Sequence, residues 1–154
     1  GEGVRAGGSE LESHDKFNIF VSLVAKFLKS MNAIKSHKEL IVYQLAFRLS
    51  MEIYNSSKKF PIEEVYSLTS QIRRSSRSVC ANLAEAFRKR RYEKAFVSKL
   101  SDSEGEAAET QVWLDYSFEC GYMQNEKYLE LITEYEKIIG MLVNMLKRPD
   151  KWSF

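Results

Sequence analysis

Residues 60–100 read FPIEEVYSLTSQIRRSSRSVCANLAEAFRKRRYEKAFVSKL. On a helical wheel of about 100° per residue, the apolar side chains of this stretch gather in one sector, and most arginines fall in another. The apolar sector holds Val65, Leu68, Ile72, Val79, Leu83 and Ala86, with Phe87 at its margin. Pro61 suits a first helical turn. The pattern predicts an amphipathic helix from Pro61 to Lys89 that buries one face.

Three more helices are predicted on either side of this one, over 36–57, 92–119 and 125–148. Ser36 and Glu39 form a capping box at the first of them, and Gly121 and Pro149 end the other two. The expected inner stripe of 36–57 is Leu40, Tyr43, Phe47, Met51 and Tyr54. Because the connections are short, we expect an all-α, up-and-down antiparallel four-helix bundle over 35–148, with a C-terminal tail at 149–154.

The predicted third helix places two polar side chains on its core face. That face holds Phe96, Val97, Leu100, Ala107, Leu114 and Phe118, together with Glu104 and Gln111. A buried carboxylate is costly unless it is paired. We therefore expect Glu104 to have an arginine or another hydrogen-bond donor beside it.

Residues 1–34 are expected to be an extension of the bundle. Residues 1–13 are glycine-rich and polar and are predicted to be unstructured. The run 19–25 has the apolarity of a short signal-peptide core, but an additional amphipathic helix using Phe17, Phe20, Val24, Phe27 and Leu28 fits it better. Met31 opens a phrase typical of a natural start, so we give residues 1–30 little functional weight.

Composition narrows the classes of function. The chain has 154 residues, of which 44% are hydrophobic, and a formal net charge of +2. Seven glycines and two prolines are few for a turn-rich all-β fold. No window of about 18 residues is free of charge, so no membrane span is expected. Two cysteines and two histidines leave little for a metal site, a disulfide framework or another cofactor, and we expect a cytoplasmic protein with free thiols.

No catalytic constellation is visible. The sequence has no glycine-rich phosphate loop, zinc-ligand spacing, HExxH motif or Glu-x-x-His pair. His14 falls in the extension and His37 at a helix start, and Cys80 lies next to core residue Val79, where a small buried thiol is expected rather than a nucleophile. We therefore expect a protein that is not an enzyme and has no catalytic residues.

Charge is strongly segregated along the chain. From Gln71 to Leu100 there are nine basic and two acidic residues, a net +7, and from Ser101 to Gly140 there are two basic and ten acidic residues, a net −8. Arg73, Arg74, Arg77 and Arg88 share one side of the second helix, and Asp102, Glu106 and Glu109 form an acidic strip beside Trp113 and Tyr116 on the third. Such strips are either solvated faces or complementary surfaces through which copies of the chain form a ring.

The run Arg88 to Arg91, with Lys94, could contact phosphates, and Tyr92 could stack on a base.

Several motifs resemble those of one known family. They are Phe60-Pro61, Leu68-Thr69-Ser70-Gln71-Ile72-Arg73-Arg74, Ser78-Val79 with Asn82-Leu83-Ala84-Glu85, and Glu109-Thr110-Gln111. Over about residues 35–147 the chain resembles the bacterial 23S rRNA intervening-sequence proteins. The family usually has a glycine where this chain has Ala86.

The resemblance implies a four-helix bundle that assembles into a ring-like homopentamer, with RNA binding as an expectation. A related group, the accessory proteins of diversity-generating retroelements, implies an alternative: a protein-interaction scaffold for a reverse transcriptase. The residues expected to contact nucleic acid are Arg74, Arg88, Lys89, Arg90, Arg91 and Lys94. Those expected to have structural roles or to form subunit contacts are Arg73, Arg77, Asn82, Glu85, Asp102, Glu104, Glu106, Glu109 and Trp113.

Overall fold

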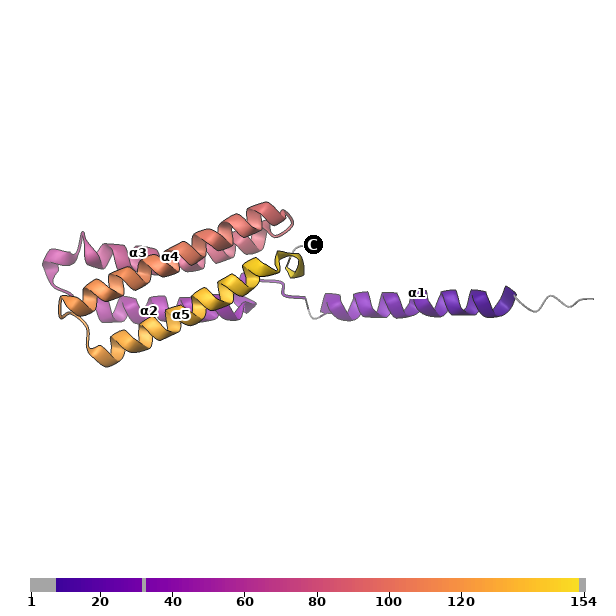
Figure 1. Ribbon diagram of the computed structural model, residues 1–154, viewed down its shortest axis with the longest axis horizontal. Coiled ribbons are helices and arrows are strands. Elements are labelled where there is room, and N and C mark those ends of the chain that lie inside the picture. The colour runs from indigo at the N-terminus through magenta and orange to yellow at the C-terminus, as the bar shows by residue number, and fades with distance from the viewer. Residues whose placement is uncertain (1–7, 32, 153–154) are drawn as a thin grey trace, which may run out of the picture. The chain divides into compact units, whose positions relative to one another are not determined.

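Helices make up every regular element of the residues that the computed structural model describes, 8–31 and 33–152 (Figure 1). The α-helices are α1 (Gly8–Met31), α2 (Ile41–Ser57), α3 (Leu68–Lys89), α4 (Glu93–Glu119) and α5 (Asn125–Lys147). Three single 3-10 turns are η1 (His37–Glu39), η2 (Ile62–Glu64) and η3 (Pro149–Lys151). The chain divides into two units, residues 1–35, which contain α1, and residues 36–154, which contain the other elements.

The second unit is the predicted bundle. Its helices make contact in a closed cycle, in which α3 packs on α2 and α4, and α5 packs on α4 and α2. The α3–α4 contact is the most extensive, and Figure 1 shows the four helices running side by side with turns at both ends. The prediction of an all-helical bundle is confirmed.

The apolar stripe predicted for α3 is buried as expected. Leu68, Ile72, Val79, Leu83, Ala86 and Phe87 all lie in the core. Val65 is the exception, since it precedes the helix and is partly exposed. The residues before α3 form η2 and a turn, so α3 begins at Leu68 rather than at Pro61. A Glu64 carboxylate oxygen accepts a hydrogen bond from the Leu68 backbone N–H at 3.2 Å and so caps the helix.

The stripe predicted to face inward on α2 was wrong except for Leu40, which is buried just before the helix begins. The buried residues of α2 are Val42, Ala46, Leu49, Ser50, Ile53 and Ser57. Phe47 is 51% exposed, and Met51 is also exposed. The helix carries two apolar stripes about 100° apart, because residues 42, 46, 49 and 53 and residues 43, 47, 51 and 54 both follow helical spacing. The aliphatic stripe at 42, 46, 49 and 53 is buried in the core, and the stripe at 43, 47, 51 and 54, which is mostly aromatic, lies nearer the surface.

Small hydroxyl side chains line the seam between α3 and α4. Ser103 Oγ donates a hydrogen bond to the Val79 carbonyl oxygen across the seam at 2.8 Å. Thr110 Oγ1 lies 2.9 Å from Ser75 Oγ and 2.8 Å from the Glu106 carbonyl oxygen. These hydrogen bonds satisfy the buried hydroxyls. Because the serine and threonine side chains are small, the two helices can approach closely.

The same seam corrects the face predicted for α4. The buried residues are Phe96, Leu100, Ser103, Ala107, Thr110, Leu114 and Ser117. Val97, Glu104, Gln111 and Phe118, expected in the core, are only half-buried. Glu104 therefore keeps access to water and does not need the buried partner that we expected for it.

The predicted signals at the helix ends are largely confirmed. Ser36 and Glu39 form the capping box, which starts η1, with the Ser36 backbone N–H donating to Glu39 at 2.9 Å. Gly121 follows α4 with a φ of 76°, a left-handed conformation that glycine adopts without strain. The expected C-terminal tail begins with η3, and residues 153–154 lie outside the described part of the chain.

The expected N-terminal helix is present as α1. Residues 8–13, which we expected to be unstructured, belong to it, and the rest of that prediction falls on residues 1–7, outside the described residues. Its large apolar side chains from Phe17 to Leu28 are exposed. Within the described residues, no helix combines the length and the apolarity needed to cross a membrane.

Replacing Gly105 by alanine is expected to stabilise the bundle by about 0.5–1 kcal/mol, because glycine in the middle of a helix costs backbone entropy. A Cβ at this position would meet no neighbouring atom within 4 Å. Gly121→Ala should instead destabilise, because its φ is left-handed. Urea unfolding of both variants tests this, and a destabilised Gly105→Ala would contradict the open surroundings of this site.

Candidate nucleic-acid interface

The turn between α3 and α4 displays the basic run predicted to contact phosphates. Because α3 ends at Lys89 and α4 begins at Glu93, the run straddles a tight turn at the end of the bundle. Arg88, Lys89, Arg91 and Lys94 are exposed there. Tyr92 is 65% exposed, with the Arg91 guanidinium 5.8 Å from its ring centroid. The turn thus combines exposed cations with an exposed aromatic ring.

Arg90 differs from its neighbours in the run. It is half-buried, with its guanidinium carbon 3.7 Å from the centroid of the Phe87 ring and Nη1 donating to the Phe87 carbonyl oxygen at 2.7 Å. Burial, and secondarily Arg88, lowers the pKa of this guanidinium. Arg90 therefore closes the C-terminal end of α3, where cations also interact favourably with the helix dipole.

Antiparallel topology adds basic residues from other elements to the same end. The starts of α2 and α4 and the ends of α3 and α5 lie together there (Figure 1), η1 contacts α3, and η3 contacts α4. The basic residues at this end are Lys38, Arg88, Lys89, Arg90, Arg91, Lys94, Lys147, Arg148 and Lys151. The acidic ones are Glu39, Glu93 and Asp150, which leaves a net charge of +6. We call this set the basic end.

Arg74 is neutralised within the subunit by two carboxylates of α4. Its guanidinium bonds Glu109 at 2.6 Å and Glu106 at 3.2 Å, which joins α3 to α4. Trp113 Nε1 donates to the other Glu109 oxygen at 3.3 Å. Hydrogen bonding to Arg74 lowers the pKa of Glu109, and the same carboxylates raise the pKa of Arg74. Arg74, expected at the nucleic-acid surface, has a structural role here, as have Glu106 and Glu109.

Replacing Glu109 by glutamine is expected to destabilise the bundle at neutral pH by about 0.2–1 kcal/mol, the range for partly exposed ion pairs. The pKa of Glu109 is lowered on folding, so its contribution is present above the ordinary carboxyl range and is lost as the pH falls through the folded-state value. Urea unfolding of wild type and variant should therefore differ at pH 7 and converge in acid. An equal difference at both pH values would show that the charge of Glu109 is not responsible.

Other residues expected to have structural roles or to form subunit contacts make contacts within their own subunit. Arg73 and Arg77 lie over the ring of Tyr54 on α2, at 4.9 and 5.6 Å from its centroid. The side-chain amide nitrogen of Asn82 donates to the Ser78 carbonyl oxygen within α3. Lys99 bonds Glu85 at 3.0 Å and Asp102 at 3.7 Å, so these two carboxylates also have partners in their own subunit.

Comparison with known proteins identifies the family to which this bundle belongs. The model of the 23S rRNA-intervening sequence protein family matches residues 38–144, which cover α2 to α5 almost completely. The chain belongs to this family. None of the curated proteins compared with the chain matches it.

Among solved structures, the family member is similar to a protein of unknown function from the S23 ribosomal protein family of Bacteroides thetaiotaomicron. The two are 27% identical with a TM-score of 0.63, and the match covers 70% of this chain and 96% of the other. The resemblance seen in the motifs of α3 and α4 is thus confirmed at the level of family and fold.

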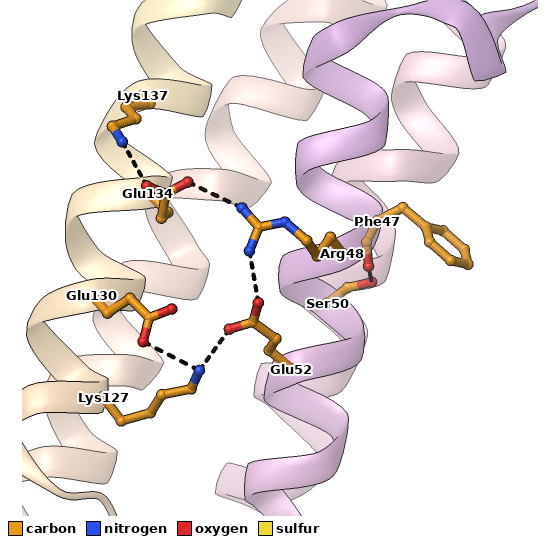
Figure 2. Close-up of polar contacts among 8 residues, drawn as sticks. All are labelled: Phe47, Arg48, Ser50, Glu52, Lys127, Glu130, Glu134 and Lys137. Carbon is orange, nitrogen blue, oxygen red and sulfur yellow. Dashed lines mark hydrogen bonds and ion pairs between the residues drawn. The ribbon is translucent and has the colours of Figure 1, made fainter.

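Sequence reasoning missed a ladder of ion pairs that closes the α2–α5 side of this family member. Figure 2 shows its rungs. They join Lys127 to Glu52 (2.6 Å) and Glu130 (3.4 Å), and Arg48 to Glu52 (2.8 Å) and Glu134 (3.3 Å), and the ladder ends at Lys137 with Glu134 (2.6 Å). The pairs within one helix had a signal in the sequence, an i, i+4 spacing for Arg48–Glu52 and an i, i+3 spacing for Lys127–Glu130 and Glu134–Lys137. The two pairs between α2 and α5 had none. The cations of this side are matched by carboxylates and are poor candidates for phosphate contact.

The cysteine in the core of this family member is Cys80. Burial raises the pKa of the Cys80 thiol to about 12, so the thiol stays protonated and unreactive at neutral pH. No group of three or more histidine, cysteine or acidic residues in the described part of the chain is placed to hold a metal ion. The site described above consists of charged and aromatic side chains at the surface.

Proposed function

We propose that this member of the 23S rRNA-intervening sequence protein family is a cytoplasmic, oligomeric protein that is not an enzyme and binds RNA through its basic end. The net charge of +6 at one end of the bundle carries this proposal. A near-neutral chain has no general attraction for a polyanion, so clustering of this kind is what RNA binding requires.

The binding mode is electrostatic. Arg88, Lys89, Arg91 and Lys94 would neutralise phosphates and release counterions, and Tyr92 would stack on an unpaired base. The exposed ring of Tyr92 and the cations around it suit single-stranded segments better than a duplex. We propose that affinity depends more on phosphate number than on base sequence.

A salt titration tests the proposal. The full chain is titrated into a fluorescently labelled, unstructured single-stranded RNA at several salt concentrations. The logarithm of the association constant should fall linearly with the logarithm of salt concentration, by about 0.7 for each phosphate contacted. No detectable binding at low salt would contradict the proposed function.

Oligomerisation is part of the proposal and is supported by two exposed apolar surfaces. On α2, Tyr43, Phe47 and Met51 form the stripe that the core leaves outside, with the rings of Tyr43 and Phe47 stacked 6.1 Å apart. On α4, Val112 and Tyr116 are exposed beside Trp113. A closed ring such as the expected pentamer needs two different surfaces that meet head to tail. Arg74 and the acidic strip already neutralise one another within the subunit, so we propose the apolar surfaces as the contact.

Replacing Phe47 by glutamate is expected to dissociate the oligomer, because a charge would be buried in the contact. Leu129→Glu, at an exposed position of α5 outside both surfaces, is the matched control and should leave the assembly intact. Light scattering at micromolar concentration measures both. A monomeric wild type, or an unchanged assembly of Phe47→Glu, would contradict the proposed contact.

A second candidate function is favoured by the same exposed surfaces. As a protein-interaction scaffold, the chain would present Phe47, Met51 and Tyr116 to a partner such as a reverse transcriptase. The genomic position of the reading frame separates the two candidates. A location inside an rRNA gene favours the RNA-binding function, and an adjacent reverse transcriptase gene favours the scaffold.

A further inference from the structure

A groove of about 780 Å³ lies at the end of the bundle opposite the basic end. Its walls come from the last residues of α2, the turn with η2, and the first half of α3. The lining is cationic and aromatic, with Lys58, Phe60, Tyr66, Arg73, Arg74 and Arg77 as its charged and aromatic members. Among the residues that the structure describes, no aspartate or glutamate lines it.

Three of these cations lie around one aromatic ring, that of Tyr54 on α2. Lys58 Nζ and the guanidinium carbons of Arg73 and Arg77 lie 4.7, 4.9 and 5.6 Å from the centroid of the Tyr54 ring. The ring attracts each of them, but it carries no net charge that would neutralise them. Among the described residues, none of the three has a carboxylate within ion-pairing distance, in contrast to Arg74. The groove therefore holds positive charge that its own subunit leaves uncompensated.

Hydrogen-bonding capacity in the groove is also unused. Arg73 donates from Nε to Ser57 Oγ at 2.8 Å, which fixes the guanidinium in place and leaves its Nη groups available. Thr69, in the groove wall, is buried, and its hydroxyl has no hydrogen-bond partner among the described residues. Since Glu64 already caps α3, the helix N-terminus is not counted as an anion site.

The edge of the groove presents an aromatic ring to solvent. Tyr66 is 95% exposed, which is unusual for so large a side chain, and Ile62 beside it is exposed as well. A flat ring next to a cluster of cations matches a nucleotide, in which a base is attached to a phosphate-bearing sugar. An acidic segment of a second copy would satisfy the cations but would not explain the exposed ring.

The outer face of α3 connects this groove to the basic end. Arg73, Arg77, Ala81, Ala84 and Arg88 follow one another at helical spacing, and the two alanines keep the surface between the arginines low. From Arg77 to Arg88 the rise along the helix is about 17 Å, at about 1.5 Å per residue. A strand of several nucleotides could therefore touch both places.

We infer that the groove binds a phosphate of a single-stranded RNA through Lys58, Arg73 and Arg77, with the neighbouring base stacked on Tyr66. This inference rests on the proposed function, because it assigns the same RNA a second point of contact. It gives a second reason for the preference for single strands, since a duplex does not free a base for Tyr66.

The test uses a labelled, unstructured 12-nucleotide RNA and the full chain. Tyr66→Ala should weaken binding by about five-fold to a hundred-fold without changing the salt slope, and Tyr66→Phe should bind as wild type does. Lys58→Ala with Arg77→Ala should lower the salt slope by about 1.4, because two phosphate contacts are lost. Both side chains are exposed, and urea unfolding checks that the bundle remains stable in these variants.

The outcomes separate this inference from the proposed function. Unchanged affinity in the groove variants, together with loss of binding when the basic end is neutralised, would overturn the inference and leave the function standing. A changed assembly in Lys58→Ala with Arg77→Ala at unchanged RNA affinity would identify the groove as a contact between copies, which also overturns it. Absence of RNA binding by the wild type would remove both.

Discussion

Simultaneous replacement of Arg88, Lys89 and Arg91 by alanine is expected to lower RNA affinity about a hundredfold at 0.1 M salt. Three lost phosphate contacts, at about 0.7 each, reduce the salt slope by about 2, which corresponds to this factor if affinity at 1 M salt is unchanged. The three side chains are exposed, so their loss should barely alter stability. Fluorescence anisotropy at several salt concentrations measures both affinity and slope.

The control for this prediction removes the same charge elsewhere. Replacing Lys59, Lys127 and Lys137 by alanine also lowers the net charge by three, but Lys127 and Lys137 already pair with carboxylates of the α2–α5 ladder. If RNA binding followed net charge alone, the two triple variants would weaken equally. The account predicts a much smaller loss in the control.

Replacing Ala107 by leucine is expected to have the largest effect on folding stability, a loss of about 1–3 kcal/mol or more. Ala107 is 0% exposed and lies between Ser103 and Thr110 on α4, whose hydroxyls contact α3 across the seam. A longer side chain would push the helices apart and strain these hydrogen bonds. Urea unfolding gives the change in the free energy of unfolding.

The neighbouring residue supplies the control for overpacking. Ala108 is exposed on the same helix, and its replacement by leucine should change stability by less than about 0.5 kcal/mol. Because both variants have the same composition, a difference between them reports packing rather than helix propensity. Equal effects would mean that the α3–α4 seam can accommodate a longer side chain at position 107 without strain.

The helices and their order could be predicted because strong local signals agree. The wheel of α3 separates apolar from basic residues, the Ser36–Glu39 box caps the start of the bundle, and Gly121 ends α4. Each signal depends on a few neighbouring residues and needs no knowledge of the tertiary structure. This is why α3 was oriented correctly from its sequence.

The buried face of a helix was predicted wrongly where two apolar stripes compete or where polar residues are buried. On α2 two apolar stripes share helical spacing, and periodicity cannot tell which one the neighbours cover. On α4 the core includes Ser103, Thr110 and Ser117, whose hydroxyls bond to backbone carbonyls, so a wheel of hydrophobic residues places its centre wrongly and turns Glu104 inward.

The candidate site, too, was only partly predictable from local sequence. The exposed run at the α3–α4 turn was visible in the sequence, but its extension by Lys147, Arg148 and Lys151 depends on the antiparallel packing of α5. The clamp of Arg74 by Glu106 and Glu109 also needs the register of α3 against α4, because the paired residues lie 32 and 35 positions apart in the sequence. Such long-range pairings follow from the fold rather than from local pattern.

The position of bound RNA on the bundle distinguishes binding at the basic end from binding elsewhere. Ultraviolet cross-linking of a single-stranded RNA to the full chain, followed by mass spectrometry of the peptides, reports which residues touch the RNA. We expect cross-links within residues 88–94, with Tyr92 prominent among them. Cross-linked RNA found only elsewhere on the bundle, with none in 88–94, would contradict it.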